Sequence, residues 1–118
     1  EILVKDNHIK VLGGIKKTLK AINTKKIQNF KIECETISQV KMSIIAGTKY
    51  ILLDNMNPSE IKKSIKLKNT LKSRVKFEIT GGIKLKNLKK FICLGADFIS
   101  SSEITNCPKS VDIGMDLI

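Results

Sequence analysis

Two acidic residues that follow short apolar runs are the best candidates for chemistry in this chain. Glu35 comes after the run at residues 30–34, and Asp54 comes after the run at residues 50–53. If the two runs are adjacent strands, both carboxylates lie at matching strand ends. There they can accept hydrogen bonds from ribose hydroxyls, hold magnesium, or stabilise a developing positive charge. A lone acidic residue at a strand end is common, so the prediction depends on the pair.

Two turns rich in small residues predict a phosphate site. Thr80, Gly81 and Gly82 follow the apolar run at residues 75–79, and a serine turn that includes Ser101 and Ser102 follows the run at 98–99. Glycines let the backbone approach an anion closely, and free N–H groups at a turn or a helix start favour negative charge. A Gly-Gly pair is also a common turn, so the two turns are considered together as borders of one pocket.

Other polar residues near the strand ends give weaker signals. Lys5 ends the first strand, and beside the two carboxylates it is a candidate ligand for an anion. His8 is as compatible with a hydrogen-bonded loop as with catalysis. Cys34 lies inside an apolar strand pattern, which favours packing over a nucleophile. Three cysteines without a Cys-x-x-Cys spacing, together with one histidine, do not assemble a zinc site.

These residues need a scaffold in which strands and helices alternate. The pattern predicts strands at residues 2–4, 30–34, 50–53, 75–79 and 98–99, and helices at 15–22, 37–46, 58–71 and 85–94. Such alternation indicates an α/β fold with parallel strands, in which ligands bind beyond the carboxyl ends of the strands. A closed barrel takes roughly 250 residues. We therefore expect residues 1–118 to form an open, partial α/β barrel.

Alternation along the strands predicts one apolar and one polar face. Residues 30, 32 and 34 are apolar while 31, 33 and 35 are charged, and residues 75, 77 and 79 are apolar while 76, 78 and 80 are polar. Charges inside a fold need partners. The polar face therefore indicates either a cleft that binds a charged ligand or a structural network of salt bridges.

Composition restricts the class of protein. With 42% hydrophobic and 28% charged residues in 13.2 kDa, we expect a single globular domain in the cytoplasm, with reduced thiols. No apolar run approaches the roughly 20 residues of a membrane span. The formal charge of +11 comes from lysines and Arg74, and with four Phe, one Tyr and no Trp it argues weakly for nucleic-acid binding. An RNA-binding module remains an alternative on charge alone.

Six short blocks, taken in order, resemble a known family. The blocks are Lys5-Asp6-Asn7-His8-Ile9, Gly13-Gly14, Ile32-Glu33-Cys34-Glu35, Leu52-Leu53-Asp54-Asn55-Met56, Glu78-Ile79-Thr80-Gly81-Gly82-Ile83 and Asp112-Ile113-Gly114-Met115-Asp116. Together they are similar to the quinolinate phosphoribosyltransferases, also called nicotinate-nucleotide pyrophosphorylases (carboxylating). The similarity covers nearly all 118 residues.

The resemblance implies an activity and roles for residues. Quinolinate and phosphoribosyl pyrophosphate would give nicotinate mononucleotide, pyrophosphate and CO2, with Mg²⁺, in NAD biosynthesis. Lys5 would bind the anionic substrates. Glu35 and Asp54 would hold the ribose hydroxyls and stabilise the transition state. The 5-phosphate would lie on Thr80, Gly81 and Gly82, beside Ser101 and Ser102. The resemblance also implies an incomplete barrel after an N-terminal α/β sandwich domain, in a homodimer or larger oligomer.

Three departures from the family pattern accompany the resemblance. Thr80 replaces a usual serine but keeps the hydroxyl, and Ser102 replaces a usual glycine, which adds a side chain at the phosphate loop. The cationic residues that bind the quinolinate carboxylates would lie before Glu1, which is also not a methionine. We therefore expect a C-terminal part of the enzyme that is inactive by itself. The alternative is a truncated remnant without activity.

Overall fold

A sheet of five parallel strands, in the order β1-β2-β3-β4-β5, forms the frame of the computed structural model, which describes residues 2–106 and 113–115. The strands are β1 (Ile2–Val4), β2 (Phe30–Cys34), β3 (Tyr50–Asp54), β4 (Lys76–Thr80) and β5 (Phe98–Ile99). Each strand pairs with the next one along the chain. All the carboxyl ends therefore lie at one edge of an open sheet, as expected for a partial barrel.

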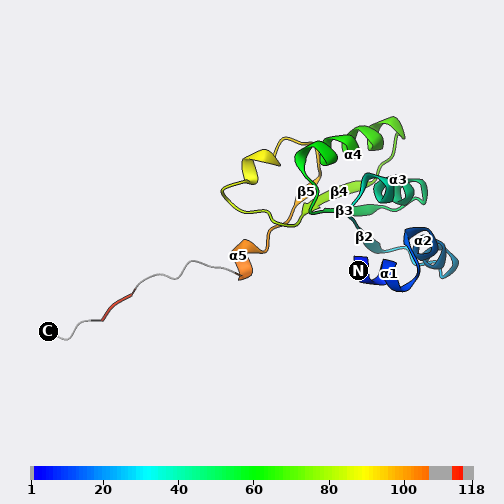
Figure 1. Cartoon of the computed structure of the whole chain (residues 1–118), viewed down its shortest axis with the longest axis horizontal. Helices are drawn as coiled ribbons and strands as arrows, with labels where there is room; N and C mark the ends of the chain where they lie inside the picture. Colours follow the sequence, from blue (N-terminus) through cyan, green and yellow to red (C-terminus); the bar gives the residue numbers. More distant parts are fainter. Residues whose placement is uncertain (1, 107–112, 116–118) are drawn as a thin grey trace.

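The helices between the strands pack on one face of the sheet, whereas the last short helix follows β5 and lies away from this layer (Figure 1). They are α1 (Asp6–Val11), α2 (Ile15–Thr24), α3 (Ile37–Ile45), α4 (Pro58–Thr70), the 3₁₀ segment η1 (Leu88–Lys90) and α5 (Glu103–Asn106). The N-cap side chains of Thr36 and Asn57 accept backbone N–H bonds at the starts of α3 and α4. These capping boxes fix where each helix leaves the carboxyl edge of the sheet.

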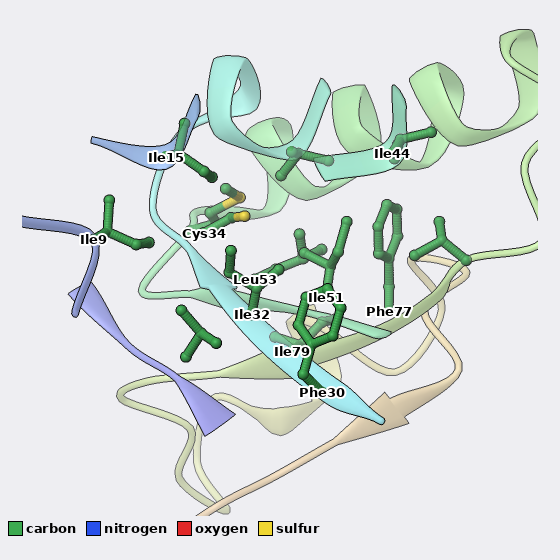
Figure 2. Packing of buried hydrophobic residues seen from close by; sticks show 14 of the residues in the cluster. Ile9, Ile15, Phe30, Ile32, Cys34, Ile44, Ile51, Leu53, Phe77 and Ile79 are labelled. Carbon is green, nitrogen blue, oxygen red and sulfur yellow. The ribbon is translucent and has the colours of Figure 1, made fainter. Parts of the chain in front are cut away.

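The core lies between this helix layer and the apolar face of the sheet. Figure 2 shows Ile51 and Phe77, which are fully buried, on the strands below Ile44 of α3. Apolar side chains two residues apart on a strand point to the same face, so β2, β3 and β4 each supply pairs to this layer. The division into an apolar and a polar face that was predicted for β2 and β4 is confirmed, because buried residues alternate with half-buried or exposed ones along both strands.

The opposite face of the sheet is polar, and none of the helices in the described part of the chain covers it (Figure 1). Lys31, Glu33, Glu78 and Thr80 lie there half-buried, and Leu52 of β3 is the one buried apolar residue on this side among residues 2–106 and 113–115. The ion pair between Lys31 Nζ and Glu78 Oε2, at 3.1 Å, joins β2 to β4. Part of the expected salt-bridge network is therefore present on the same face that leads to the predicted ligand site.

Two expectations about the connections are wrong. The segment between the predicted strand at 2–4 and the predicted helix at 15–22 was expected to be a loop but contains α1, and residues 85–94 form turns around η1 rather than a continuous helix. In the second case Asn87 intervenes: its side chain accepts from Lys84 N at 2.8 Å and donates to Gly82 O at 2.9 Å. These bonds stabilise a turn at the position where a helix would need a regular backbone. Among the described residues, no helix has the length and apolar character required to cross a membrane.

Candidate functional site

A cavity of about 640 Å³ opens at the carboxyl ends of β4 and β5. Five of the predicted site residues line it together, from the two predicted turns: Thr80, Gly81, Gly82, Ser101 and Ser102. Ile83, Lys84, Ser100, Glu103 and Asn106 complete the lining. The two turns thus border one pocket, as the sequence predicted.

Gly81 is required by the close approach of two strand ends. It has φ +86°, and a Cβ added there would lie 2.7 Å from the backbone N of Asn55. Asn55 N in turn donates to Thr80 O at 3.0 Å, which holds the turn against the end of β3. Gly82, at φ +63°, has nothing within 4 Å of an added Cβ and faces open space. The turn therefore exposes backbone that a ligand can reach.

The serine turn is held in place by side-chain hydrogen bonds. Ser101 Oγ donates to Ile83 O at 2.6 Å and accepts from Glu103 N at 3.2 Å. Glu103 Oε2 accepts from Leu85 N at 2.9 Å. The Ser101 hydroxyl is therefore used within the protein, whereas Ser102 is exposed at the cavity. The helix start expected after Gly82 is absent, so an anion in this cavity would depend on turn N–H groups and hydroxyls.

A second group of charged residues lies along the same edge of the sheet. Asp54 ends β3 directly opposite Thr80 in the β3–β4 register, and its Oδ2 accepts from Asn55 Nδ2 at 3.0 Å. Lys5 Nζ lies 3.8 Å from Glu33 Oε1. Burial raises the pKa of Glu33; Lys5 opposes the shift and the negative charge of Asp54 adds to it. Glu33, Asp54 and Lys5 thus form one electrostatically coupled cluster.

Glu35 directly follows β2, as the sequence predicted. The strand ends at Cys34, and Glu35 is exposed one residue beyond it, with its N–H donating to Gln39 Oε1 at 2.7 Å. The pKa of Lys10 is raised mainly by its hydrogen bond to Asp6 and further by the charge of Glu35. The carboxylate of this strand that contacts Lys5 is therefore Glu33.

Two residues with weak sequence signals have structural roles. His8 Nδ1 accepts from Lys5 N at 3.0 Å, which caps the start of α1. Cys34 is fully buried, with Sγ 3.5 Å from Ser43 Oγ, and burial raises its pKa to about 11. The packing role predicted for Cys34 is thus confirmed. The last block of the resemblance, residues 112–116, lies largely outside the described residues.

Sequence reasoning missed Glu33 and Glu78 as residues of the site. Both were assigned to the polar face of the sheet, but only the residues that end each strand were treated as candidates. The strand end at Cys34 was predicted, but Glu33 lies within the strand, where its side chain has a fixed direction, whereas Glu35 follows the strand. Asn55 had no such signal, since its contact with Gly81 depends on packing between strands.

Whether the site can hold Mg²⁺ depends on which side-chain oxygen atoms lie close together. Within residues 2–106 and 113–115, no three His, Cys, Asp or Glu side chains group closely enough to hold a metal ion. Mg²⁺ is commonly bound by one or two carboxylates together with substrate phosphates. Asp54 and Glu33, whose negative charges repel each other, suit that second arrangement.

Known proteins resemble this chain in both sequence and structure. A nicotinate-nucleotide pyrophosphorylase (carboxylating), termed probable, from Bacillus subtilis is 35% identical over 118 residues, which cover 98% of this chain and 40% of the relative. The Homo sapiens nicotinate-nucleotide pyrophosphorylase is 30% identical, with 98% and 40% covered. The crystal structure of the Ehrlichia chaffeensis nicotinate-nucleotide pyrophosphorylase superposes with a TM-score of 0.79 at 37% identity, covering 89% of this chain and 38% of that one.

The fold and the position of the cavity define an α/β protein built from part of a parallel barrel. The chain belongs to the family described as quinolinate phosphoribosyl transferase, C-terminal domain, whose pattern matches residues 1–116. It spans about 40% of the length of the curated relatives it matches.

Proposed function

We propose that this chain is the ribose-phosphate-binding part of an enzyme that transfers the phosphoribosyl group of phosphoribosyl pyrophosphate to quinolinate. The products are nicotinate mononucleotide, pyrophosphate and CO2. The observation that carries the proposal is the arrangement at one sheet edge: a cavity lined by two turns at the ends of β4 and β5 lies beside a cluster of carboxylates and a lysine at the ends of β1, β2 and β3. Membership of the family and the names of the relatives support it.

The 5-phosphate lies in the cavity formed by the two turns. The exposed backbone of Gly81 and Gly82 offers N–H donors, and the hydroxyls of Thr80 and Ser102 add polar contacts. Lys84 lines the same cavity and contributes a positive charge. Because Asp54 is opposite Thr80 in the register, a ribose attached to this phosphate extends toward the carboxylates.

The carboxylates act on the ribose. When the bond between the anomeric carbon and pyrophosphate breaks, positive charge develops on the sugar ring, and fixed negative groups nearby lower the barrier. We assign this role to Asp54 together with Glu33; Glu35 remains the other candidate from this strand. Lys5 attracts the anionic substrates and limits the repulsion between the carboxylates. Mg²⁺, held by the pyrophosphate and a carboxylate, would neutralise the leaving group. The proposal also includes two features expected of the family: quinolinate is the second substrate, and the complete protein forms a homodimer or a larger homo-oligomer.

The test is calorimetric titration of the chain with phosphoribosyl pyrophosphate and MgCl₂, using Asp54→Asn, Glu33→Gln and Glu35→Gln as variants. Asp54→Asn and Glu33→Gln should weaken binding about tenfold, the effect of losing one charged hydrogen bond to the ligand. Glu35→Gln removes the same charge from the same segment and tests the other candidate carboxylate, and binding should change little if Glu33 is the residue that contacts the ribose. Circular dichroism establishes that each variant is folded.

Either of two outcomes would contradict the proposal. If the folded chain does not bind, the alternative of an inactive remnant is favoured. If binding depends on Glu35 and not on Glu33, the assignment within β2 is reversed. The same titration at increasing salt separates a specific site from general attraction to a chain of charge +11, because non-specific attraction falls steeply with salt.

A further inference from the structure

Glu78 lies between the sheet and the phosphate cavity and contacts both. It belongs to β4, two residues before Thr80, so the two side chains point to the same polar face. Its Oε1 accepts from Ser100 Oγ, and its Oε2 lies 3.1 Å from Lys31 Nζ. The Glu78 side chain is 17% exposed. Both carboxylate oxygens are therefore occupied by contacts within the protein.

Ser100 needs this contact because β5 is short. β5 has two residues, which pair with Glu78 and Ile79. Backbone hydrogen bonds extend the pairing by one residue on each side, from Asp97 N to Phe77 O and from Ser100 N to Ile79 O, each at 2.9 Å. The serine turn that forms one wall of the cavity begins at Ser100. A side-chain hydrogen bond at this position fixes where the wall starts relative to the turn at Gly81 and Gly82, which ends β4.

Lys31 offsets the negative charge that Glu78 places near the cavity. A carboxylate two residues from a phosphate-binding turn would repel a phosphate, since unit charges within 10 Å interact appreciably where water is partly excluded. The Lys31 ammonium, which also lies 5.8 Å from the centre of the Tyr50 ring, pairs with Glu78 and offsets that repulsion. Lys31 thereby lets an anchoring carboxylate lie next to an anion site.

We propose that Glu78 is a positioning residue for the phosphate cavity: it holds Ser100 in place, and Lys31 neutralises it. The inference rests on the proposed role of the cavity in binding phosphate. It assigns to Glu78 no contact with the ligand. An acceptor at position 78 is needed for the geometry, whereas the negative charge is needed only as the partner of Lys31.

The first arm of the experiment uses no ligand. Amide NMR spectra of the chain are compared with those of Glu78→Ala, Glu78→Gln and, as a stability control in the helix layer, Ile44→Val. Glu78→Ala should shift the signals of residues 100–103 and Leu85. Glu78→Gln, whose amide oxygen still accepts from Ser100, should shift them far less. Unchanged signals in Glu78→Ala, or equal changes in Ile44→Val, would overturn the positioning role.

The second arm titrates the same samples with ribose 5-phosphate. Glu78→Ala should weaken binding about tenfold, and Glu78→Gln should retain affinity within about twofold, because only the first loses the hydrogen bond. Lys31→Gln should weaken binding about fivefold at low salt and less at high salt. The double variant Lys31→Gln/Glu78→Gln should recover most of that loss, an effect that damage to the fold alone would not produce.

The two arms distinguish failure of this inference from failure of the proposed function. A parent chain that does not bind ribose 5-phosphate contradicts the proposed function, and the first arm still decides whether Glu78 positions the turn. A parent chain that binds, with equal affinity in Glu78→Ala, overturns the inference and leaves the proposed function intact. Absence of rescue in the double variant would overturn the neutralising role of Lys31.

Discussion

Glu33 carries a charge in surroundings that oppose it. Its side chain is 15% exposed and lies on the polar face of β2, 3.8 Å from the ammonium of Lys5. Burial raises its pKa above the ordinary value of 4.5; Lys5 counteracts the shift and Asp54 reinforces it. Side chains with a shifted pKa are common where ligands bind, because the same burial and charge that shift the pKa also act on a ligand.

The raised pKa of Glu33 predicts a pH-dependent stability. The folded state takes up the proton more readily than the unfolded state, so this contribution is complete below pH 4.5 and is lost as the pH rises through the higher folded pKa. Glu33→Gln stays neutral and escapes the loss. Its stability relative to the parent should therefore increase between pH 4 and pH 7 in urea unfolding experiments.

Glu35→Gln provides the matched control for this measurement, because it removes the same charge from an exposed residue two positions along the chain. A rise of equal size in both variants would show that net charge, and not the burial of Glu33, causes the effect. No rise in Glu33→Gln would contradict the shifted pKa.

Candidate site residues could be predicted from the sequence where the type of residue limits the backbone conformation or where the residue follows a clear strand. Gly81 and Gly82 signalled an unusual backbone, and Asp54 followed a clear strand, so these positions were found from the sequence. The end of β2 at Cys34 agrees with the predicted strand, and Glu35 was preferred to Glu33 because it directly follows that strand. Residues 33 and 35 are two positions apart, so alternation along the strand does not distinguish between them. The partners of Glu78 could not be predicted, since they come from β2 and from the end of β5.

At the scale of elements, helix starts at the carboxyl edge place the connections. Asn57 Oδ1 accepts from Ser59 N at 2.9 Å and from Glu60 N at 3.0 Å, while Glu60 Oε2 accepts from Asn57 N at 2.9 Å. With Pro58 in the first turn, this segment has every signal of a helix start. α4 was therefore predictable from the sequence almost to its bounds.

Removal of this cap tests how much α4 depends on it. Asn57→Ala leaves two N–H groups without their acceptor and should lower the free energy of unfolding by about 1 kcal/mol. Asn57→Asp keeps an acceptor and should cost much less. Thermal and urea unfolding of both variants measure the difference. Equal losses in the two would show that the hydrogen bonds of the cap do not limit stability.

The wrong helix at residues 85–94 shows where periodicity alone is insufficient. Leu85 and Ile92 suggested a helical apolar face, yet Leu85 is 83% and Ile92 is 58% exposed. Leu88, Phe91 and Leu94 pack against the core from turns. The segment has no capping box, and the hydrogen bonds of Asn87 compete with a helical backbone. Local side-chain bonds therefore outweighed the apolar pattern.

At the scale of the whole molecule, helices cover one face of the sheet, and no helix among the described residues covers the other face (Figure 1). In a closed parallel barrel the inner face is filled by side chains from all strands. Here the polar face carries Lys31, Glu33 and Glu78 half-buried, and Leu3 of β1 and Phe98 of β5 are 38% and 47% exposed. The site at the carboxyl edge thus depends on a sheet whose outer strands, β1 and β5, have no further neighbour among the described residues.

These open edges predict self-association of the 118-residue chain. An unpaired strand offers its N–H and C=O groups to another chain, and exposed apolar side chains add to the attraction. β1 is the more exposed case, because Ile2 is 51% exposed at the edge of the sheet. The chain should elute in size-exclusion chromatography at a size that increases with protein concentration.

Two variants test whether the edge strand causes this association. Ile2→Lys places a charge on the edge strand and should shift elution toward the monomer, whereas Lys20→Ala, on the exposed side of α2, should not. A sharp monomer peak at all concentrations would show that the polar face and short edge strands already prevent pairing.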